Sequence, residues 1–337
     1  MKQVIIILTL AIGIVTSCQK DDFTRSGIAE DHFFLKNKNQ NMPVIVAGNL
    51  DSKKMILVIH GGPGGTSQIY REDFVRDNVE SEFAMVYWDQ RIAGMTQGNW
   101  GDINVNAFRD DLKKLIQLLK VEYGSDQKIY LFAHSWGGFL APYFMLDGLN
   151  EKMVEGWIQV DGSHNYLLND SLTEQMLLYY GNQELSAGRN ADFWEEIVNW
   201  CEDNDYRGRK SSAKLNKYAY KAQNMFDVYT DSLSAALSNY SSIGSNMSNS
   251  WSSGIYGIHR QPFDHLTSDS LHKLTLPILL LWGKYDFVCP PGLAEDIEAN
   301  IRSTDVHKVI FEHSGHGPMF NERELFWNEV VDWMRNH

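Results

Sequence analysis

The fold is decided by residues 128–138, which read Lys-Ile-Tyr-Leu-Phe-Ala-His-Ser-Trp-Gly-Gly. An apolar run leads into Ser135, small residues stand two positions either side of it (Ala133 and Gly137), and a helix-like run follows. This pattern is typical of a nucleophile elbow, a strained strand-to-helix turn that forces a serine side chain outward. Small neighbours are needed because the two arms of the turn nearly touch; Ala133 is small, although glycine is more usual there. The alternative is an ordinary helix start after a buried strand, with Ser135 as its cap.

Short apolar runs alternate with helical patterns on both sides of this turn. Continuous apolar strands of this kind are typical of a mostly parallel sheet that is covered by helices on both faces. A turn at 49–51 joins the first two predicted strands. The predicted strands are 43–47, 55–59, 83–88, 128–132, 157–160, 277–282 and 308–311, and helices are predicted at 104–123, directly after Ser135, and at 326–334.

A long helical region interrupts this alternation between two of the predicted strands. Its helical stretches are 172–187, 191–203 and 212–224, and a Ser/Asn-rich segment at 238–253 reads as a loop. An insertion at the side of a parallel sheet where the ligand crevice lies is typical of a cap or lid. We therefore predict a helical cap over 164–265, and a core made of 31–163 and 266–337.

The composition is that of an ordinary globular protein, with 337 residues of which 43% are hydrophobic and 22% charged. The formal net charge of −13 disfavours nucleic acid and anionic membrane surfaces as partners. No CxxC pair or histidine-rich cluster suggests a metal site, and we predict neither a metal nor a cofactor.

The N-terminus has the features of a bacterial lipoprotein leader. A short basic start and an apolar run too short to cross a membrane comfortably are followed by Val15-Thr16-Ser17-Cys18, which resembles a lipobox. We predict a signal peptide over 1–18, a lipid on Cys18, and a polar tether over 19–30. Gln19-Lys20-Asp21-Asp22 resembles the tag that exports lipoproteins of the Bacteroidetes type, so the expected location is the outer membrane, at the cell surface. The alternative is a plain secretory signal in which Cys18 is incidental.

Two further cysteines, Cys201 and Cys289, lie far apart in the sequence. They could form one disulfide in an oxidising compartment, but nothing in their spacing requires it.

A serine hydroxyl becomes a nucleophile only when a base takes its proton and an acid orients that base. In hydrolases built on a nucleophile elbow, these residues follow in the order Ser, then Asp or Glu, then His. Asp286 is our candidate acid, because it lies just beyond the predicted strand ending at Trp282. Asp161, which follows the predicted strand ending at Val160, is the rival.

The candidate base is His316, on a glycine-flanked loop between the last predicted strand and the last helix. His313, nearer the strand end, is the alternative. The oxyanion of the reaction needs backbone N–H donors, which we assign to Trp136, the residue after the nucleophile, and to Gly62 in the glycine-rich loop 60–65. Gly61 is the second choice for the latter, and the loop fits neither the phosphate-binding nor the dinucleotide pattern.

Three motifs together carry a family resemblance: His60-Gly61-Gly62-Pro63-Gly64-Gly65, then Trp88-Asp89-Gln90-Arg91, then His134-Ser135-Trp136-Gly137-Gly138. The chain resembles the proline iminopeptidase family of α/β-hydrolases, serine peptidases that remove N-terminal residues, over residues 43–162 and 270–337. The resemblance implies an α/β-hydrolase fold with a helical cap. One departure is the segment 92–96, Ile-Ala-Gly-Met-Thr, where the family usually has Gly-x-Gly-x-Ser.

A second departure concerns the cap. The family's aminopeptidases bind the substrate's ammonium group with cap carboxylates, whereas the carboxylates of this cap stand in no matching context and read as a solvated helix face. They are Glu174, Glu195, Glu196, Glu202 and Asp227.

The resemblance implies a serine hydrolase that acts through an acyl-enzyme, and most specifically an aminopeptidase that releases N-terminal proline or other small residues from peptides. The alternative within the same chemistry is an esterase or lactonase, since relatives in this fold class include both. A different class, a surface-anchored binding protein that keeps the fold without the chemistry, is motivated by the lipobox and by the departures at Ala133 and after Arg91. The expected partner is therefore a small peptide or ester.

Overall fold

The computed structural model describes residues 27–98, 103–203, 209–226 and 257–337. Within these ranges nine strands form one sheet in the order β1-β2-β4-β3-β6-β7-β8-β9, with β5 paired to β2. The strands are β1 Ile28–Asn37, β2 Gln40–Asn49, β3 Lys54–Ile59, β4 Ala84–Trp88, β5 Gln97–Gly98, β6 Lys128–His134, β7 Gly156–Val160, β8 Ile278–Gly283 and β9 Val306–Phe311.

The sheet is mostly parallel, as predicted. The six strands from β4 to β9 in the sheet order (β4, β3, β6, β7, β8 and β9) pair with one another in parallel. β1, β2 and β5 form the antiparallel end, which joins this part through an antiparallel pairing of β2 with β4. β1 was not predicted, because its sequence, Ile-Ala-Glu-Asp-His-Phe-Phe-Leu-Lys-Asn, has neither a long apolar run nor a regular alternation of polar and apolar residues. It begins at Ile28, inside the stretch 19–30 predicted as a tether.

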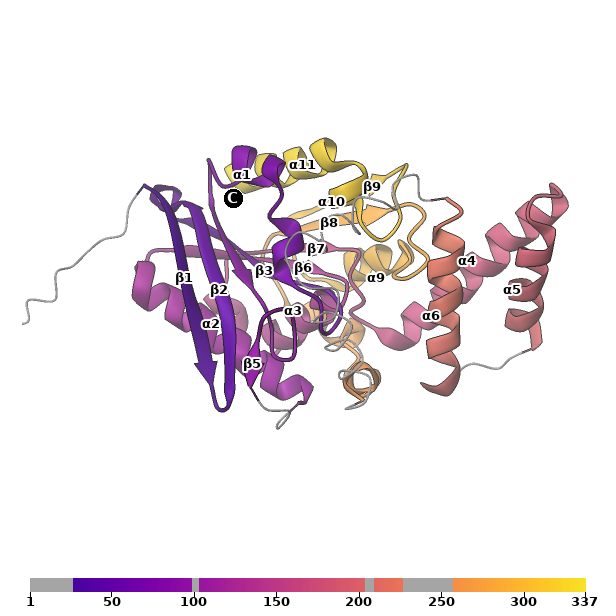
Figure 1. The fold of residues 1–337 in the computed structure, drawn as a ribbon, viewed down its shortest axis with the longest axis horizontal. Helices are drawn as coiled ribbons and strands as arrows, with labels where there is room; N and C mark the ends of the chain where they lie inside the picture. The colour runs from indigo at the N-terminus through magenta and orange to yellow at the C-terminus, as the bar shows by residue number, and fades with distance from the viewer. Residues whose placement is uncertain (1–26, 99–102, 204–208, 227–256) are drawn as a thin grey trace, which may run out of the picture.

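Helices cover both faces of the sheet (Figure 1). α2 and α3 lie against one face and α1 and α11 against the other, because the strands are apolar on both sides: in β3, Leu57 belongs to the first apolar cluster and Ile56 to the second. The helices of the core are α1 Asp73–Asn78, α2 Val105–Tyr123, α3 Gly137–Met145, α9 Gly292–Asn300, α10 Pro318–Asn321 and α11 Arg323–Asn336, with short 3₁₀ turns at η1 Leu50–Ser52, η2 Ser67–Tyr70, η3 Asn150–Met153, η4 Ile258–Asp264 and η5 Ser268–Lys273.

A helical insertion stands between β7 and β8, as predicted, and projects beyond one end of the sheet (Figure 1). Its described helices are α4 Tyr166–Ser186, α5 Ala191–Asp203 and α6 Arg209–Gln223. The first begins six residues earlier than the predicted 172, because the Asn165 side chain accepts a hydrogen bond from the Leu168 N–H and so caps the helix. The loop predicted at 238–253 lies outside the described residues.

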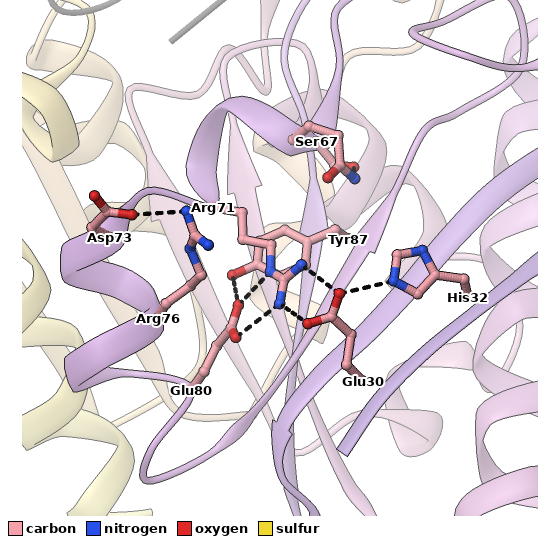
Figure 2. A network of polar contacts seen from close by, with 9 residues as sticks. Glu30, His32, Ser67, Arg71, Asp73, Arg76, Glu80 and Tyr87 are labelled. Carbon is pink, nitrogen blue, oxygen red and sulfur yellow. Dashed lines mark hydrogen bonds and ion pairs between the residues drawn. The ribbon is translucent and has the colours of Figure 1, made fainter. Parts of the chain in front are cut away.

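Arg71, just after η2, ties the edge strand β1 to the body of the core (Figure 2). Its guanidinium donates to both oxygens of Glu30 in β1 and to Glu80, which also accepts from the Tyr87 hydroxyl. The hydrogen bond from Arg71 lowers the pKa of the Glu30 carboxyl to about 2. The polar edge strand is thereby fixed by charge as well as by its backbone pairing.

Candidate active site

The strand–turn–helix geometry predicted around Ser135 is present between β6 and α3. Ser135 has a φ of 55°, in the left-handed region, and its N–H donates to the carbonyl of Val160 on the next strand at 3.1 Å. A Cβ on Gly137 would collide with the backbone carbonyl of Ile59, which explains the glycine. Ala133 is different: it lies inside β6, paired with Ile59 and Gln159, where a methyl group is buried without difficulty.

An unbroken chain of hydrogen bonds links Asp286, His316 and Ser135. His316 Nε2 lies 2.9 Å from Ser135 Oγ, and His316 Nδ1 lies 2.8 Å from Asp286 Oδ2. The other oxygen of the fully buried Asp286 accepts from the N–H groups of Val288 and Cys289, both at 2.8 Å. With the imidazole proton on Nδ1, Nε2 is free to accept the serine proton.

Neither rival takes the place of its predicted counterpart. Asp161 is buried close to His316, but the partner of His316 Nδ1 is Asp286; the Oδ1 of Asp161 accepts from the N–H of Gly283 at 2.9 Å and so holds the end of β8. His313 is exposed, and its backbone N–H donates to Glu322. The residues in contact are therefore those predicted from their order along the chain.

The two predicted oxyanion donors, Gly62 and Trp136, line one cavity together with Ser135. In the described part of the chain no acceptor is assigned to the backbone N–H of either residue, so both are available to an oxygen of the substrate. The loop lies very close to the nucleophile, since a Cβ on Gly61 would be 2.9 Å from the Cβ of Ser135. Gly61, the second choice, is absent from the cavity lining within the described ranges.

Gln90 bridges the two segments that carry these donors. Its amide nitrogen donates to the carbonyl of His60 at 3.0 Å, and its amide oxygen accepts from the indole N–H of Trp136 at 3.1 Å. One buried side chain thus fixes the spacing between the glycine-rich loop and the elbow. Gln90 is part of the motif 88–91, but the sequence alone did not show that it bonds to both segments.

The segment 92–96, which departs from the family pattern, is hydrogen-bonded to Asp89. Asp89 accepts from the N–H of Ser67 at 2.8 Å through one oxygen, and from the N–H of Met95 at 3.0 Å through the other. The segment therefore folds back onto Asp89 in spite of its different sequence.

His134, next to the nucleophile, is kept neutral. It is buried, its Nδ1 lies 2.7 Å from the Tyr70 hydroxyl, and desolvation holds its pKa well below the usual 6.5. Its ring centroid is 5.0 Å from that of His316. A neutral His134 adds no positive charge beside the imidazole of His316.

A cavity of about 630 Å³ separates Ser135 from the cap. Asp170 of α4 is the only acidic residue among the described residues that line it, and Arg260 supplies a guanidinium. Asp170 accepts a hydrogen bond from Ser212 of α6 at 3.0 Å, and burial raises the pKa of its carboxyl to about 6. The cavity can therefore hold a polar, charged substrate.

Asp170 was missed from the sequence because the helix was expected to begin at 172. Of the cap carboxylates named in the sequence analysis, Glu174, Glu195, Glu196 and Glu202 do not line the cavity: the last three are exposed and Glu174 is half-buried. Asp227 lies outside the described residues.

Two sets of side chains bring their ligand atoms within 4.8 Å of one another, namely His134, Asp161 and His316, and Asp286, Cys289 and His316. Both sets need the His316 nitrogens, which are already hydrogen-bonded to Asp286 and Ser135. A metal there would compete with the triad. Cys201 and Cys289 are both free and buried.

Comparisons with known proteins agree with this fold. The sequence matches the family described as alpha/beta hydrolase fold over residues 54–322. It is 22% identical to a probable aminopeptidase of Bacillus subtilis, over 87% of this chain and 93% of the relative, and 23% identical to the proline iminopeptidase of Clostridioides difficile, over 86% and 92%. An esterase from Exiguobacterium antarcticum has the same fold, with a TM-score of 0.60 and 20% identity over 90% of this chain and 98% of that one.

Proposed function

The chain belongs to the α/β hydrolase fold family, and on that premise we propose that it is a serine hydrolase acting through an acyl-enzyme on Ser135. The hydrogen-bonded chain from Asp286 through His316 to Ser135 carries the proposal. Ser135 Oγ bonds to the substrate carbonyl carbon while His316 Nε2 takes its proton, and the N–H groups of Gly62 and Trp136 stabilise the oxyanion.

The leaving group then departs with the proton held by His316, which completes acylation. A water molecule, deprotonated by the same imidazole, attacks the acyl carbon, and the proton returns to Ser135 as the acid product leaves. Asp286 keeps the imidazole in the productive tautomer and stabilises its cationic form in both half-reactions.

The substrate we propose is a peptide or amide with a free N-terminal residue, proline or another small one. Two observations support this choice. The curated relatives include a probable aminopeptidase and a proline iminopeptidase, and the Asp170 carboxylate faces the cavity that Ser135 lines. A cationic N-terminus beside this half-buried carboxylate would form a charge-assisted hydrogen bond.

Asp170→Asn is expected to raise the KM for L-proline p-nitroanilide about tenfold, because a hydrogen bond between charged groups contributes about 1.5–3 kcal/mol. In the wild type, KM should be lowest between pH 6 and pH 8. Below pH 6 the Asp170 carboxyl is protonated, and above about pH 8 an α-amino group loses its charge. Steady-state kinetics across pH test this, with Glu174→Gln on the same helix as the control that leaves KM unchanged.

The same assay separates the peptidase from the alternative esterase or lactonase. Asp170→Asn should leave hydrolysis of p-nitrophenyl acetate unaffected, since acetate carries no ammonium group. If the protein cleaves such esters but releases p-nitroaniline from no unblocked amino-acid conjugate, the aminopeptidase proposal is wrong and the esterase stands.

We also propose that Cys18 carries a lipid that anchors the protein to a bacterial outer membrane, at the cell surface. Residues 1–26 lie outside the described structure, so this rests on the lipobox sequence alone. Within the described ranges, no helix has the length and hydropathy needed to span a bilayer.

The full-length chain, produced in a lipoprotein-processing bacterium fed an alkyne fatty acid, is expected to take up the label and sediment with the outer membrane. Cys18→Ala should lose both properties, whereas Cys201→Ser keeps them. Label that persists in Cys18→Ala would exclude the anchor at this residue, and protection of the protein from added protease in intact cells would exclude surface exposure.

A further inference from the structure

The cap helix α4 is hydrogen-bonded to the turn that carries Asp286. Thr173 Oγ1 donates to the carbonyl of Phe287 at 3.0 Å, and Asn169 Nδ2 donates to the carbonyl of Val288 at 2.9 Å. The donors precede their acceptors by 114 and 119 positions in the sequence. Thr173 is 2% exposed, so its bond is shielded from water.

These two carbonyls belong to the peptide groups whose N–H donors hold Asp286. The peptide joining Phe287 to Val288 accepts from Thr173 and donates, through the Val288 N–H, to Asp286 Oδ1. The next peptide accepts from Asn169 and donates, through the Cys289 N–H, to the same oxygen. Each peptide plane is therefore fixed at both ends, by the cap on one side and by the triad acid on the other.

A planar peptide cannot turn its N–H without turning its C=O. A donor on the C=O also polarises the group, which strengthens the hydrogen bond that its N–H makes. Thr173 and Asn169 thus act on Asp286 in two ways: they orient the two N–H groups that hold it, and they make those groups better donors. The other oxygen of Asp286, Oδ2, is thereby held in position to accept the hydrogen bond from His316 Nδ1.

Aromatic packing holds the same turn to the cap. Tyr180 of α4 contacts Phe287 at 5.4 Å between ring centroids, and Phe226, just after α6, stacks on Tyr285 at 5.1 Å. This packing fixes the distance between cap and turn but bonds to neither peptide. The hydrogen bonds of Thr173 and Asn169, in contrast, act on the two peptide groups that are themselves bonded to Asp286.

We propose that Thr173 and Asn169 are positioning residues of the catalytic triad, through which the seating of the cap on the core sets the orientation of Asp286. The inference rests on the proposed function, since it presumes that the triad is active. Asn169 and Thr173 also line the cavity, so a substrate bound against α4 touches the helix that holds the acid.

The test is the rate at which a small fluorophosphonate labels Ser135, together with kcat and KM on L-proline p-nitroanilide or, if esters are the substrate, p-nitrophenyl acetate. Thr173→Val removes the donor with little change of shape, and should lower the labelling rate and kcat roughly tenfold while KM stays near its original value. Thr173→Ser restores the donor and should recover both rates.

Thr267→Val is the matched control. Thr267 is a buried threonine that donates to the carbonyl of His164 at 2.8 Å, and this bond involves neither Asp286 nor the peptides that hold it. The Thr267→Val variant should lower Tm about as much as Thr173→Val does, but leave the labelling rate and kcat unchanged. A wild type that does not label at all defeats the proposed function. A wild type that labels while Thr173→Val labels equally fast, or while both valine variants slow alike, defeats this inference.

If Thr173→Val does not fold, Asn169→Ala tests the second peptide in the same way. A fall in kcat and labelling rate supports the positioning role, and an effect confined to KM assigns Asn169 to substrate binding alone and overturns it.

Discussion

Replacing Ser135 with alanine is expected to lower kcat on the order of 10⁶-fold, because nucleophile and base act as one unit and the loss of either removes nearly all the acceleration they give. The variant should keep its fold, since the turn is held by the Ser135 backbone N–H bonded to Val160 and not by the hydroxyl. Kinetics on the best substrate, with Tm measured in parallel, check the prediction.

Asp286→Asn serves as the companion variant, with an expected loss of about 10⁴-fold, because the amide favours the wrong imidazole tautomer while leaving the serine in place. A fluorophosphonate should label the wild type at Ser135, the Asp286→Asn variant only slowly, and the Ser135→Ala variant not at all. Wild-type protein that is folded yet unlabelled would leave the binding-protein alternative as the better account of this chain.

The triad could be predicted from sequence because each member follows a strand. Ser135 directly follows β6, Asp286 lies in the turn after β8 and His316 in the loop after β9, and the carboxyl ends of parallel strands meet at one edge of the sheet. Strand order therefore indicated the proximity that the distances in the structure establish. The same reasoning preferred Asp286 but left Asp161 as a rival, because both follow strands; the hydrogen bond to His316 Nδ1 identifies Asp286 as the partner of the imidazole.

The features that the sequence analysis missed lie where the sequence has no regular hydrophobic periodicity. The edge strand β1 mixes polar and apolar residues in no regular order, and the start of α4 at Tyr166 depends on the cap formed by Asn165. Because the predicted helix began only at 172, Asn169 and Asp170 were not expected on the same helix as Thr173. The sequence therefore did not indicate that Asn169, Asp170 and Thr173 line one cavity together.

The motif residue Arg91 illustrates a different limit. Its charge is evident from the sequence, but its partner Asp111 lies on α2 and the pair is almost fully buried, with 1% and 0% of the side chains exposed. Arg91 donates to both oxygens of Asp111, at 2.6 and 2.8 Å, and Asn37 at the end of β1 donates to one of them. The motif thus joins the loop after β4 to a helix and to the edge strand.

Arg91→Met is expected to destabilise the protein by about 3–5 kcal/mol, the range for leaving one partner of a buried ion pair uncompensated. Even with Arg91 present, burial raises the pKa of the Asp111 carboxyl above its usual value. Desolvation therefore already outweighs the attraction of the guanidinium. Without Arg91, the ionised Asp111 carboxylate loses the cationic partner that the described residues give it. Urea unfolding, compared through the midpoint and the slope m, measures the loss.

The sign of the pH dependence identifies the cause. In Arg91→Met the folded state favours protonated Asp111 more than the unfolded state does, so its stability deficit should grow as pH rises from 5 to 8. Adding Asp111→Asn removes the charge, retains a hydrogen-bond acceptor for Asn37, and should recover a large part of the loss at pH 8. A double variant as unstable as Arg91→Met, with a deficit independent of pH, would show instead that lost packing around Arg91, and not the orphaned carboxylate, sets the cost.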